Sequence, residues 1–388
     1  MGVISAIGND VAQNHLSLTT GHCGISTSLD LFPSKYAGVL PFGTVKLSNA
    51  ALQQKLDAFE PGVTRTSLLA LHAFEEAVKD GGLSAAELNS SETALIGAST
   101  VGGMCLTDEL YRDANKEDAG SAYLGSYDNA SVTLYLQQRY KVGGIINTIN
   151  TACSSSANSI MYGAMLLQQR LAKRVIVGGA DSLAKFTING FHALHILSHE
   201  ICRPFDEQRN GLNLGEGAAF LVLEREEDAA GKKIYASLSG FTNSNDAYHP
   251  SSLSEQGDGP YLAMKGALEM AGLSLAEISF INAHGTGTEN NDAVESEAMI
   301  RLFETPPPFV STKSYTGHTL GAAGAIEAVY SMLNLHKQEI YKELNFDKPV
   351  ASTGLIPQQE YKKMKVQHVM SNSFGFGGNC SSLIFSKA

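Results

Sequence analysis

Cys153 is the residue of this sequence best placed to do covalent chemistry. It lies in the segment NTACSSS (150–156), between a predicted buried strand at 144–149 and a predicted helix at 154–171 with one apolar stripe. The unpaired N–H groups and the positive dipole at the start of a helix favour a thiolate over a thiol. A thiolate is a nucleophile that needs no metal. A free cysteine is also commonly a small packing residue, so this segment alone leaves both interpretations open.

Three further segments carry polar residues and glycines where predicted strands end. They are NAHGTGT (282–288) with His284, STKSYTGH (311–318) with Lys313 and His318, and SNSFGFGGN (371–379) with Phe376. A single histidine at a strand end is more often structural than catalytic, but two of them beside a helix-capped cysteine form a much rarer set. The glycines let the backbone approach a ligand closely and place N–H groups where an oxyanion can bind.

The composition and charge exclude several other classes of protein. A net charge of −11 argues against a nucleic-acid partner, which needs a basic face. The five cysteines form no CxxC pair, which argues against a disulfide framework or structural zinc and favours a reducing cytoplasm. His192, His195 and His199 have helical spacing but no carboxylates at ligand spacing, so we expect no metal site. We also expect no membrane span and no signal peptide.

Strand and helix signals alternate along the whole chain, which is typical of an α/β architecture. We expect strands at 94–98, 144–149, 174–177, 219–223, 278–283, 309–311, 366–370 and 383–385, and helices at 68–80, 154–171, 291–303 and 319–335. The last helix is apolar on nearly all sides, which predicts a place in the centre of the molecule. Each half offers strand–loop–helix units with a polar residue at the strand end, so we expect an internal duplication. The polar stretch 224–233 is the predicted boundary.

The chemical segments, taken together, resemble those of a known family. They are TACSSS (151–156), RPFDEQRNGLNLGEG (203–217), HGTGT (284–288), Lys313 with the Gly-His pair at 317–318, and NSFGFGG (372–378). In this order, and over nearly the whole chain, they are similar to the elongating β-ketoacyl-acyl-carrier-protein synthases, Cys-His-His condensing enzymes of the thiolase superfamily. The resemblance implies a thiolase-like duplicated five-layer αβαβα sandwich and a dimer. Residues 1–228 would carry the nucleophile, and residues 229–388 would carry both histidines and the Gly-Phe-Gly-Gly gate.

The resemblance also implies a mechanism, a decarboxylative Claisen condensation. Cys153 would attack an acyl thioester, and His284 and His318 would bind the thioester carbonyl of a malonyl group and stabilise the enolate formed as carbon dioxide leaves. The acyl chain would grow by two carbons. The substrates would be acyl and malonyl thioesters on the phosphopantetheine arm of acyl carrier protein, with no separate cofactor.

Further residues take roles from the same resemblance. The backbone N–H groups of Cys153 and Phe376 would form the oxyanion hole, and Phe376 would gate the acyl pocket with Gly375 and Gly377 as hinges. We expect Lys313 to organise the site by pairing with Glu295, or to form a purely structural buried ion pair. Phe374 would support the site. Thr286 and Thr288 would bind the phosphopantetheine amides, or satisfy only the local backbone. We expect structural roles for Asp206, Arg209 and Glu216, and packing roles for Cys23, Cys105, Cys202 and Cys380.

Several questions stay open at this level. The main alternative function is a non-catalytic, chain-length-setting partner of a ketosynthase heterodimer, although Cys153 argues against it. A thiolase would need a second catalytic cysteine, and a cysteine hydrolase would need an Asn or Asp to orient one histidine. The pathway can be fatty-acid synthesis or a specialised polyene or polyketide-like lipid, and the dimer can be homo- or heteromeric. We suspect that Met104, Cys105 and Phe186 set chain length and that Lys55 and Arg65 help to dock an acidic carrier.

Overall fold

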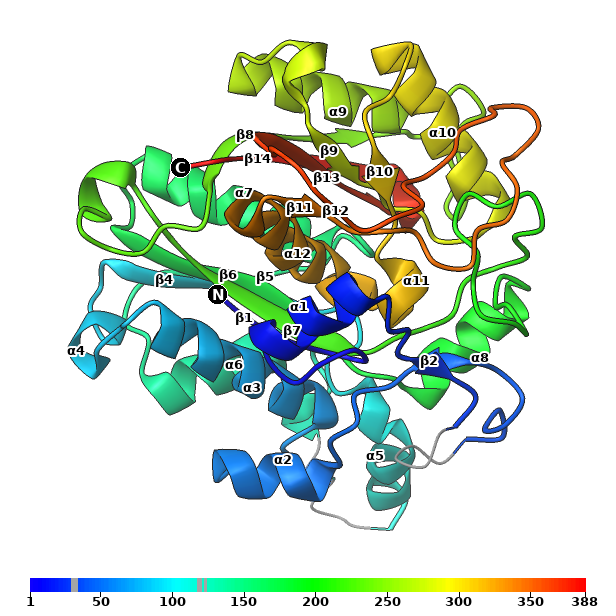
Figure 1. Ribbon diagram of the computed structural model, residues 1–388. Coiled ribbons are helices and arrows are strands. Elements are labelled where there is room, and N and C mark those ends of the chain that lie inside the picture. The colour runs from blue at the N-terminus through cyan, green and yellow to red at the C-terminus, as the bar shows by residue number, and fades with distance from the viewer. Residues whose placement is uncertain (29–33, 117–120, 122–123) are drawn as a thin grey trace.

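The computed structural model describes residues 1–28, 34–116, 121 and 124–388. Two five-stranded sheets form the framework of the fold (Figure 1). The first sheet has the order β1-β7-β6-β4-β5, with strands at Gly2–Ser5, Gly217–Glu224, Arg174–Asp181, Thr93–Ala98 and Ile146–Ile149. The second has the order β10-β9-β13-β14-β8, with strands at Phe309–Val310, Phe280–Asn282, His368–Gly375, Asn379–Ser386 and Ser237–Asn245.

The two sheets repeat the same pattern of strand directions. In the first sheet β5, β4 and β6 are parallel neighbours, and β7 and β1 follow in antiparallel pairing. In the second sheet β10, β9 and β13 are parallel neighbours, and β14 and β8 follow in antiparallel pairing. The strands also occur in the same chain order within each sheet. The predicted internal duplication of an α/β unit is therefore confirmed.

Helices complete five layers around the two sheets (Figure 1). The helices α7 (Ser155–Gln168) and α12 (Ala323–Lys337) lie between the sheets and contact both. The outer face of the first sheet is covered by α3 (Arg65–Asp80) and α6 (Ala130–Tyr140), and that of the second by α9 (Asp258–Ala271) and α10 (Glu289–Phe303). Every residue of α12 from Ala323 to Leu335 is buried, as its apolar sequence predicts. The predicted αβαβα sandwich is confirmed.

The remaining elements are short. The helices are α1 (Val11–Thr20), α2 (Asn49–Leu56), α4 (Ala85–Leu88), α5 (Thr107–Ala114), α8 (Lys185–Ala193) and α11 (Lys313–Thr316). The 3-10 turns are η1 (Met104–Leu106), η2 (Leu124–Ser126), η3 (Glu226–Asp228), η4 (Leu275–Glu277), η5 (Leu320–Ala322) and η6 (Phe376–Gly378). Two small antiparallel ribbons pair β2 (Ile25–Ser26) with β3 (Phe42–Gly43) and β11 (Glu339–Ile340) with β12 (Lys362–Lys363). No helix of the described residues has the length and apolar character needed to cross a membrane.

Some elements differ from the sequence-based expectations. The strand predicted as buried at 144–149 is β5. Among the described residues it pairs with β4 alone, at the edge of its sheet, and it is half-buried in the single chain. The strand β8 and the helix α9 were not predicted. The sequence of β8, SLSGFTNSN, is rich in serine and asparagine, and it becomes a strand because β14 pairs with it along its length.

The central helices touch at a glycine. A Cβ atom on Gly324 of α12 would lie 2.8 Å from the Cβ atom of Ala157 in α7 and 2.7 Å from its backbone nitrogen. Next to this contact, the backbone N–H of Ala325 donates to Oγ of Ser156 at 2.9 Å. The two helices therefore meet backbone to backbone near the ends at which they begin, and a larger side chain would push them apart.

This contact gives a stability prediction. The Gly324→Ala substitution should lower the free energy of unfolding by about 1–3 kcal/mol, because its methyl group overlaps the backbone of α7. Gly190→Ala is the matched control, since Gly190 lies in α8 and nothing would stand within 4 Å of its Cβ. It should gain up to about 1 kcal/mol through helix propensity. Urea denaturation of both variants measures the difference, and equal stabilities would contradict the contact's importance.

Candidate active site

Cys153, His284 and His318 share one cavity of about 430 Å3. One ligand atom from each, the sulfur and a ring nitrogen from either imidazole, lies within 4.8 Å of the others. The two rings are nearly perpendicular, with centroids 5.4 Å apart. Among the residues that the structure describes, this is the one group of histidine, cysteine and acidic side chains close enough to share a metal ion; the expectation of no metal stays a prediction.

Cys153 lies directly before α7, at a sharp turn of the backbone. Ala152 adopts the left-handed conformation with φ of +53°, which non-glycine residues rarely do, and the helix begins at Ser155. Burial raises the pKa of the Cys153 thiol to about 11. The positive charge of Lys313 and the backbone N–H groups of Phe376 and Cys153 oppose this shift without cancelling it. Burial thus acts against the thiolate that the start of a helix favours, and the expectation of a thiolate stays a prediction.

Both imidazoles are held neutral with a known orientation. Nδ1 of His284 lies 3.1 Å from Nζ of Lys313, and Nδ1 of His318 accepts the backbone N–H of Leu320 at 3.2 Å. Each ring therefore carries its proton on Nε2, free to donate. Burial lowers the pKa of both rings well below its ordinary value, and the charge of Lys313 lowers both further. The ring of Phe374 packs 5.8 Å from that of His284. Two N–H donors thus face one cavity.

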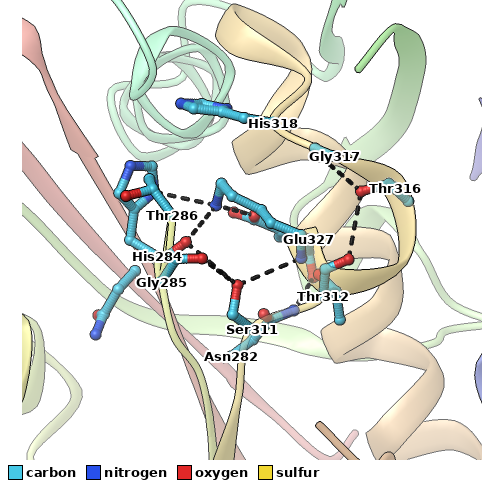
Figure 2. A network of polar contacts seen from close by, with 12 residues as sticks. Asn282, His284, Gly285, Thr286, Ser311, Thr312, Thr316, Gly317, His318 and Glu327 are labelled. Carbon is cyan, nitrogen blue, oxygen red and sulfur yellow. Dashed lines mark hydrogen bonds and ion pairs between the residues drawn. The ribbon is translucent and has the colours of Figure 1, made fainter. Parts of the chain in front are cut away.

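Lys313 pairs with a different carboxylate from the predicted one. Its Nζ forms an ion pair with Glu327 of α12 and donates to the backbone oxygen of His284 at 2.6 Å (Figure 2). The predicted pairing with Glu295 is wrong, because α12 presents Glu327 to this site from the other side of the loop. Burial raises the pKa of Glu327 to about 7, against the opposing effect of Lys313.

Glu295 instead fixes the backbone of the His284 loop. Its carboxylate accepts the N–H groups of His284 and Gly285 at 2.8 Å each, and the side-chain amide of Asn372 at 3.3 Å. Burial raises the pKa of Glu295 to about 7, although these hydrogen bonds lower it. A supporting position for Glu295 is thus compatible with its contacts, but through backbone amides rather than through Lys313.

The two threonines after His284 line the cavity. The hydroxyls of Thr286 and Thr288 lie 2.8 Å apart, so each has a local partner. The loop is shaped by Asp292, which accepts the backbone N–H of Thr286 at 2.9 Å. The contacts therefore leave both interpretations of these threonines standing, ligand binding and local structure.

The glycine-rich segment after β13 closes over the cysteine. A Cβ atom on Gly375 would lie 3.0 Å from the backbone nitrogen of Cys153, so only glycine allows this approach. Gly377 has φ of +79°, a left-handed conformation that favours glycine. Between them, the ring of Phe376 stacks on Phe191 with centroids 5.7 Å apart and an interplanar angle of 16°.

Sequence reasoning missed three residues of this site. Glu327 forms the ion pair, Asp292 holds the threonine loop, and Phe191 receives the gate ring. A signal existed for Glu327, since it is the single acidic residue in a stretch, 319–335, predicted to be buried throughout. A buried acid without a partner is costly, so it should have suggested Lys313.

The residues expected to set chain length or to dock the carrier can also be compared with the structure. Three residues suspected of setting chain length do not line the cavity: Met104, Cys105 and Phe186. Lys55 is exposed at the end of α2, as docking requires. Arg65 is buried and holds Glu216 through two hydrogen bonds of 2.8 and 2.6 Å, so its predicted docking role is wrong.

A cysteine beside two neutral imidazole donors, on a duplicated five-layer sandwich, defines a thiolase-like condensing enzyme. Residues 1–229 match the family model described as "Beta-ketoacyl synthase, N-terminal domain", and residues 235–347 match "Beta-ketoacyl synthase, C-terminal domain". The chain therefore belongs to the β-ketoacyl synthase family, and it is an acyltransferase that elongates acyl chains by condensation.

Individual relatives are similar to this chain over its full length. A putative mitochondrial 3-oxoacyl-[acyl-carrier-protein] synthase of Schizosaccharomyces pombe is 33% identical, covering 100% of this chain and 97% of its own. The 3-oxoacyl-[acyl-carrier-protein] synthase 2 of Vibrio cholerae is 32% identical with the same coverage. A solved structure is also similar, the complex of the ketosynthase ApeO with its chain length factor ApeC from Xenorhabdus doucetiae. One chain of that complex matches the present protein with a TM-score of 0.88 and 31% sequence identity. The match covers 100% of the present protein and 96% of the chain in the complex.

The lowered pKa of His318 gives a prediction for pH-dependent stability. Below about pH 6.5 the unfolded imidazole binds a proton that the folded ring does not, so this ring makes stability fall as the pH falls. Replacing it in His318→Asn should remove up to about 1.4 kcal/mol per pH unit of that slope below pH 6.5. Denaturation at several pH values measures it, with the exposed His199→Asn as control. Equal slopes for the wild type and His318→Asn would contradict a buried neutral ring.

Proposed function

We propose that this chain elongates an acyl group by two carbons, using Cys153 as nucleophile and His284 and His318 as the decarboxylation pair. The single observation that carries the proposal is the meeting of one sulfur and two imidazoles in one buried cavity. In the first half-reaction, Sγ of Cys153 attacks the carbonyl carbon of an acyl thioester. The bond from that carbon to the carrier sulfur breaks, the departing sulfur takes up the thiol proton, and the acyl group stays on Cys153.

The second half-reaction uses the two Nε2–H groups. They bind the thioester oxygen of a malonyl group, which develops negative charge as the bond to the carboxylate breaks and carbon dioxide leaves. The resulting enolate carbon attacks the acyl carbonyl on Cys153. The carbon–sulfur bond then breaks, Cys153 leaves as a thiolate that takes up a proton, and the lengthened β-ketoacyl thioester is released.

The oxyanion of the acyl transfer would be bound by the backbone N–H groups of Cys153 and Phe376. Both approach Sγ of Cys153, which supports this role. Phe376 would act as the gate and Gly375 and Gly377 as its hinges, and the stack with Phe191 would be the closed position. Lys313 would keep His284 in place from behind.

Acyl carrier protein is the proposed carrier of both substrates, with Thr286 and Thr288 near its phosphopantetheine arm. The proposal draws on the names of the relatives from Schizosaccharomyces pombe and Vibrio cholerae. No separate cofactor has a step in this mechanism. The division into a nucleophile half, 1–228, and a histidine half, 229–388, is supported by the two sheets, which draw on separate stretches of chain. A cytoplasmic location is proposed from the five free cysteines.

A dimer is proposed through the open edge of β5, which pairs only with β4 and whose flanking Ile145 is 38% exposed. A homodimer is the first choice. The heterodimer is the alternative favoured by one observation, the likeness to a chain of a ketosynthase and chain length factor complex. In either case Cys153 favours the catalytic role over the non-catalytic partner.

If Cys153 carries the acyl group and the two histidines promote decarboxylation, one variant should lose condensation and keep decarboxylation. Cys153→Gln should abolish acyl loading and condensation, because the nucleophile is gone, and should still decarboxylate malonyl-acyl-carrier protein, because both imidazoles remain. Mass spectrometry of the loaded enzyme and carbon dioxide release measure the two activities. Cys23→Ala, which removes a half-buried cysteine outside the cavity, is the control and should keep both.

Two results would contradict the proposal. One is an acyl group found on a residue other than Cys153 in the wild type. The other is loss of malonyl decarboxylation in a Cys153→Gln variant whose thermal unfolding shows an intact fold.

A further inference from the structure

A buried carboxylate outside the proposed mechanism lies behind the active-site loop. Glu343, on the segment that follows β11, is 5% exposed. Its Oε2 accepts the backbone N–H of Ser311 at 2.6 Å, and its Oε1 has no partner within hydrogen-bonding distance among the described residues. A half-satisfied carboxylate is costly inside a protein, so its place needs an explanation.

Ser311 connects this carboxylate to the catalytic loop. Its Oγ donates to the backbone oxygen of Gly285 at 2.6 Å and accepts the backbone N–H of Lys313 at 3.3 Å (Figure 2). Lys313 in turn contacts Nδ1 and the backbone oxygen of His284. A continuous path of hydrogen bonds therefore runs from Glu343 through Ser311 and Lys313 to the imidazole.

The segment that carries Glu343 is itself fixed. The backbone N–H of Glu343 donates to the backbone oxygen of Gln358 at 2.6 Å, and the hydroxyl of Tyr315 donates to the backbone oxygen of Lys342 at 2.7 Å. The carboxylate is thus presented from a rigid support. Because the backbone of Glu343 is held in place, a change in its side chain should shift Ser311 and not the segment that carries Glu343.

Burial and a neighbouring carboxylate favour the neutral form of Glu343. Burial raises its pKa to about 8, and the nearby carboxylate of Asp292 adds to this, while the backbone N–H of Ser311 and the polar groups of Ser314 and Leu344 oppose it. The shift is toward the uncharged carboxylic acid. A glutamine has the same shape, the same charge and an oxygen that accepts the N–H of Ser311.

We propose that Glu343 is a positioning residue for decarboxylation, which holds Ser311 and thereby keeps Lys313 against His284. The inference rests on the proposed function of His284. Glu343 does not line the catalytic cavity and touches no reacting atom. No hydrogen bond of this path reaches the loop of Cys153, so Glu343 should affect decarboxylation more strongly than acyl loading.

The test compares two variants of similar volume. Glu343→Gln keeps an acceptor for the N–H of Ser311, and Glu343→Met removes it. In Glu343→Met, malonyl decarboxylation should fall by about 10- to 100-fold in kcat, because a small displacement of a positioned group has this effect. Acyl loading of Cys153 should fall much less, because its backbone N–H donors stay in place. Glu343→Gln should retain both activities.

A pH profile distinguishes positioning from general destabilisation. The charge of Lys313 lowers the pKa of His284, so its displacement should let that pKa rise. The acid limb of the decarboxylation profile should then move to higher pH in Glu343→Met and stay in place in Glu343→Gln. Glu339→Gln is the matched control: this equally buried glutamate contacts His15 and Tyr361, outside the cavity, so its loss should lower stability and leave the profile unchanged.

Three results overturn the inference alone: wild-type decarboxylation in Glu343→Met, equal losses in Glu343→Gln and Glu343→Met, or an equal loss of loading and decarboxylation. If Glu343→Met does not fold, Glu343→Ala is measured with the same expectation. A wild-type protein that loads an acyl group but releases no carbon dioxide from malonyl-acyl-carrier protein would overturn the proposed function, and this inference with it.

Discussion

The backbone contact between the two central helices is the constraint on which the active site depends. Cys153 lies directly before α7, and His318 lies shortly before α12, in the equivalent place of the second sheet unit. Because Gly324 allows α12 to touch Ala157, the starts of both helices come to one point. The duplication therefore supplies two similar strand–loop–helix units, and their packing converts them into one cavity. The outer helices and the sheets serve mainly to hold these two helices in the middle layer.

Burial then decides the chemistry of the residues that meet there. The same desolvation raises the pKa of Cys153, Glu295 and Glu327 and lowers that of both imidazoles. Neutral rings whose Nδ1 atoms are occupied present Nε2–H donors, which suits an oxygen that becomes negative during reaction. The ion pair of Lys313 with Glu327 lies behind them. Such a buried pair is weak support for stability, but it fixes the orientation of a ring that must stay neutral.

Much of the fold and part of the site could be predicted from the sequence, for identifiable reasons. The central position of α12 follows from a stretch that is apolar on nearly every side. Cys153, His284 and His318 could be singled out because each has its own local signal, a strand end followed by glycines or a helix start. The partner of Lys313 could not, because Glu295 and Glu327 are both acids on helices, and only helix packing decides which one faces it. Arg65 was predicted to be an exposed docking residue because its buried partner, Glu216, is remote from it in the sequence.

The sequence by itself determined the duplicated α/β architecture and singled out Cys153, His284 and His318, since periodicity, turn glycines and short motifs are local properties of the chain. Tertiary structure alone decided which carboxylate pairs with Lys313, the burial of Cys153 and the exposure of β5. These depend on which surfaces face each other and on how much water is excluded between them. Such quantities arise from contacts between distant segments, and no local pattern carries them.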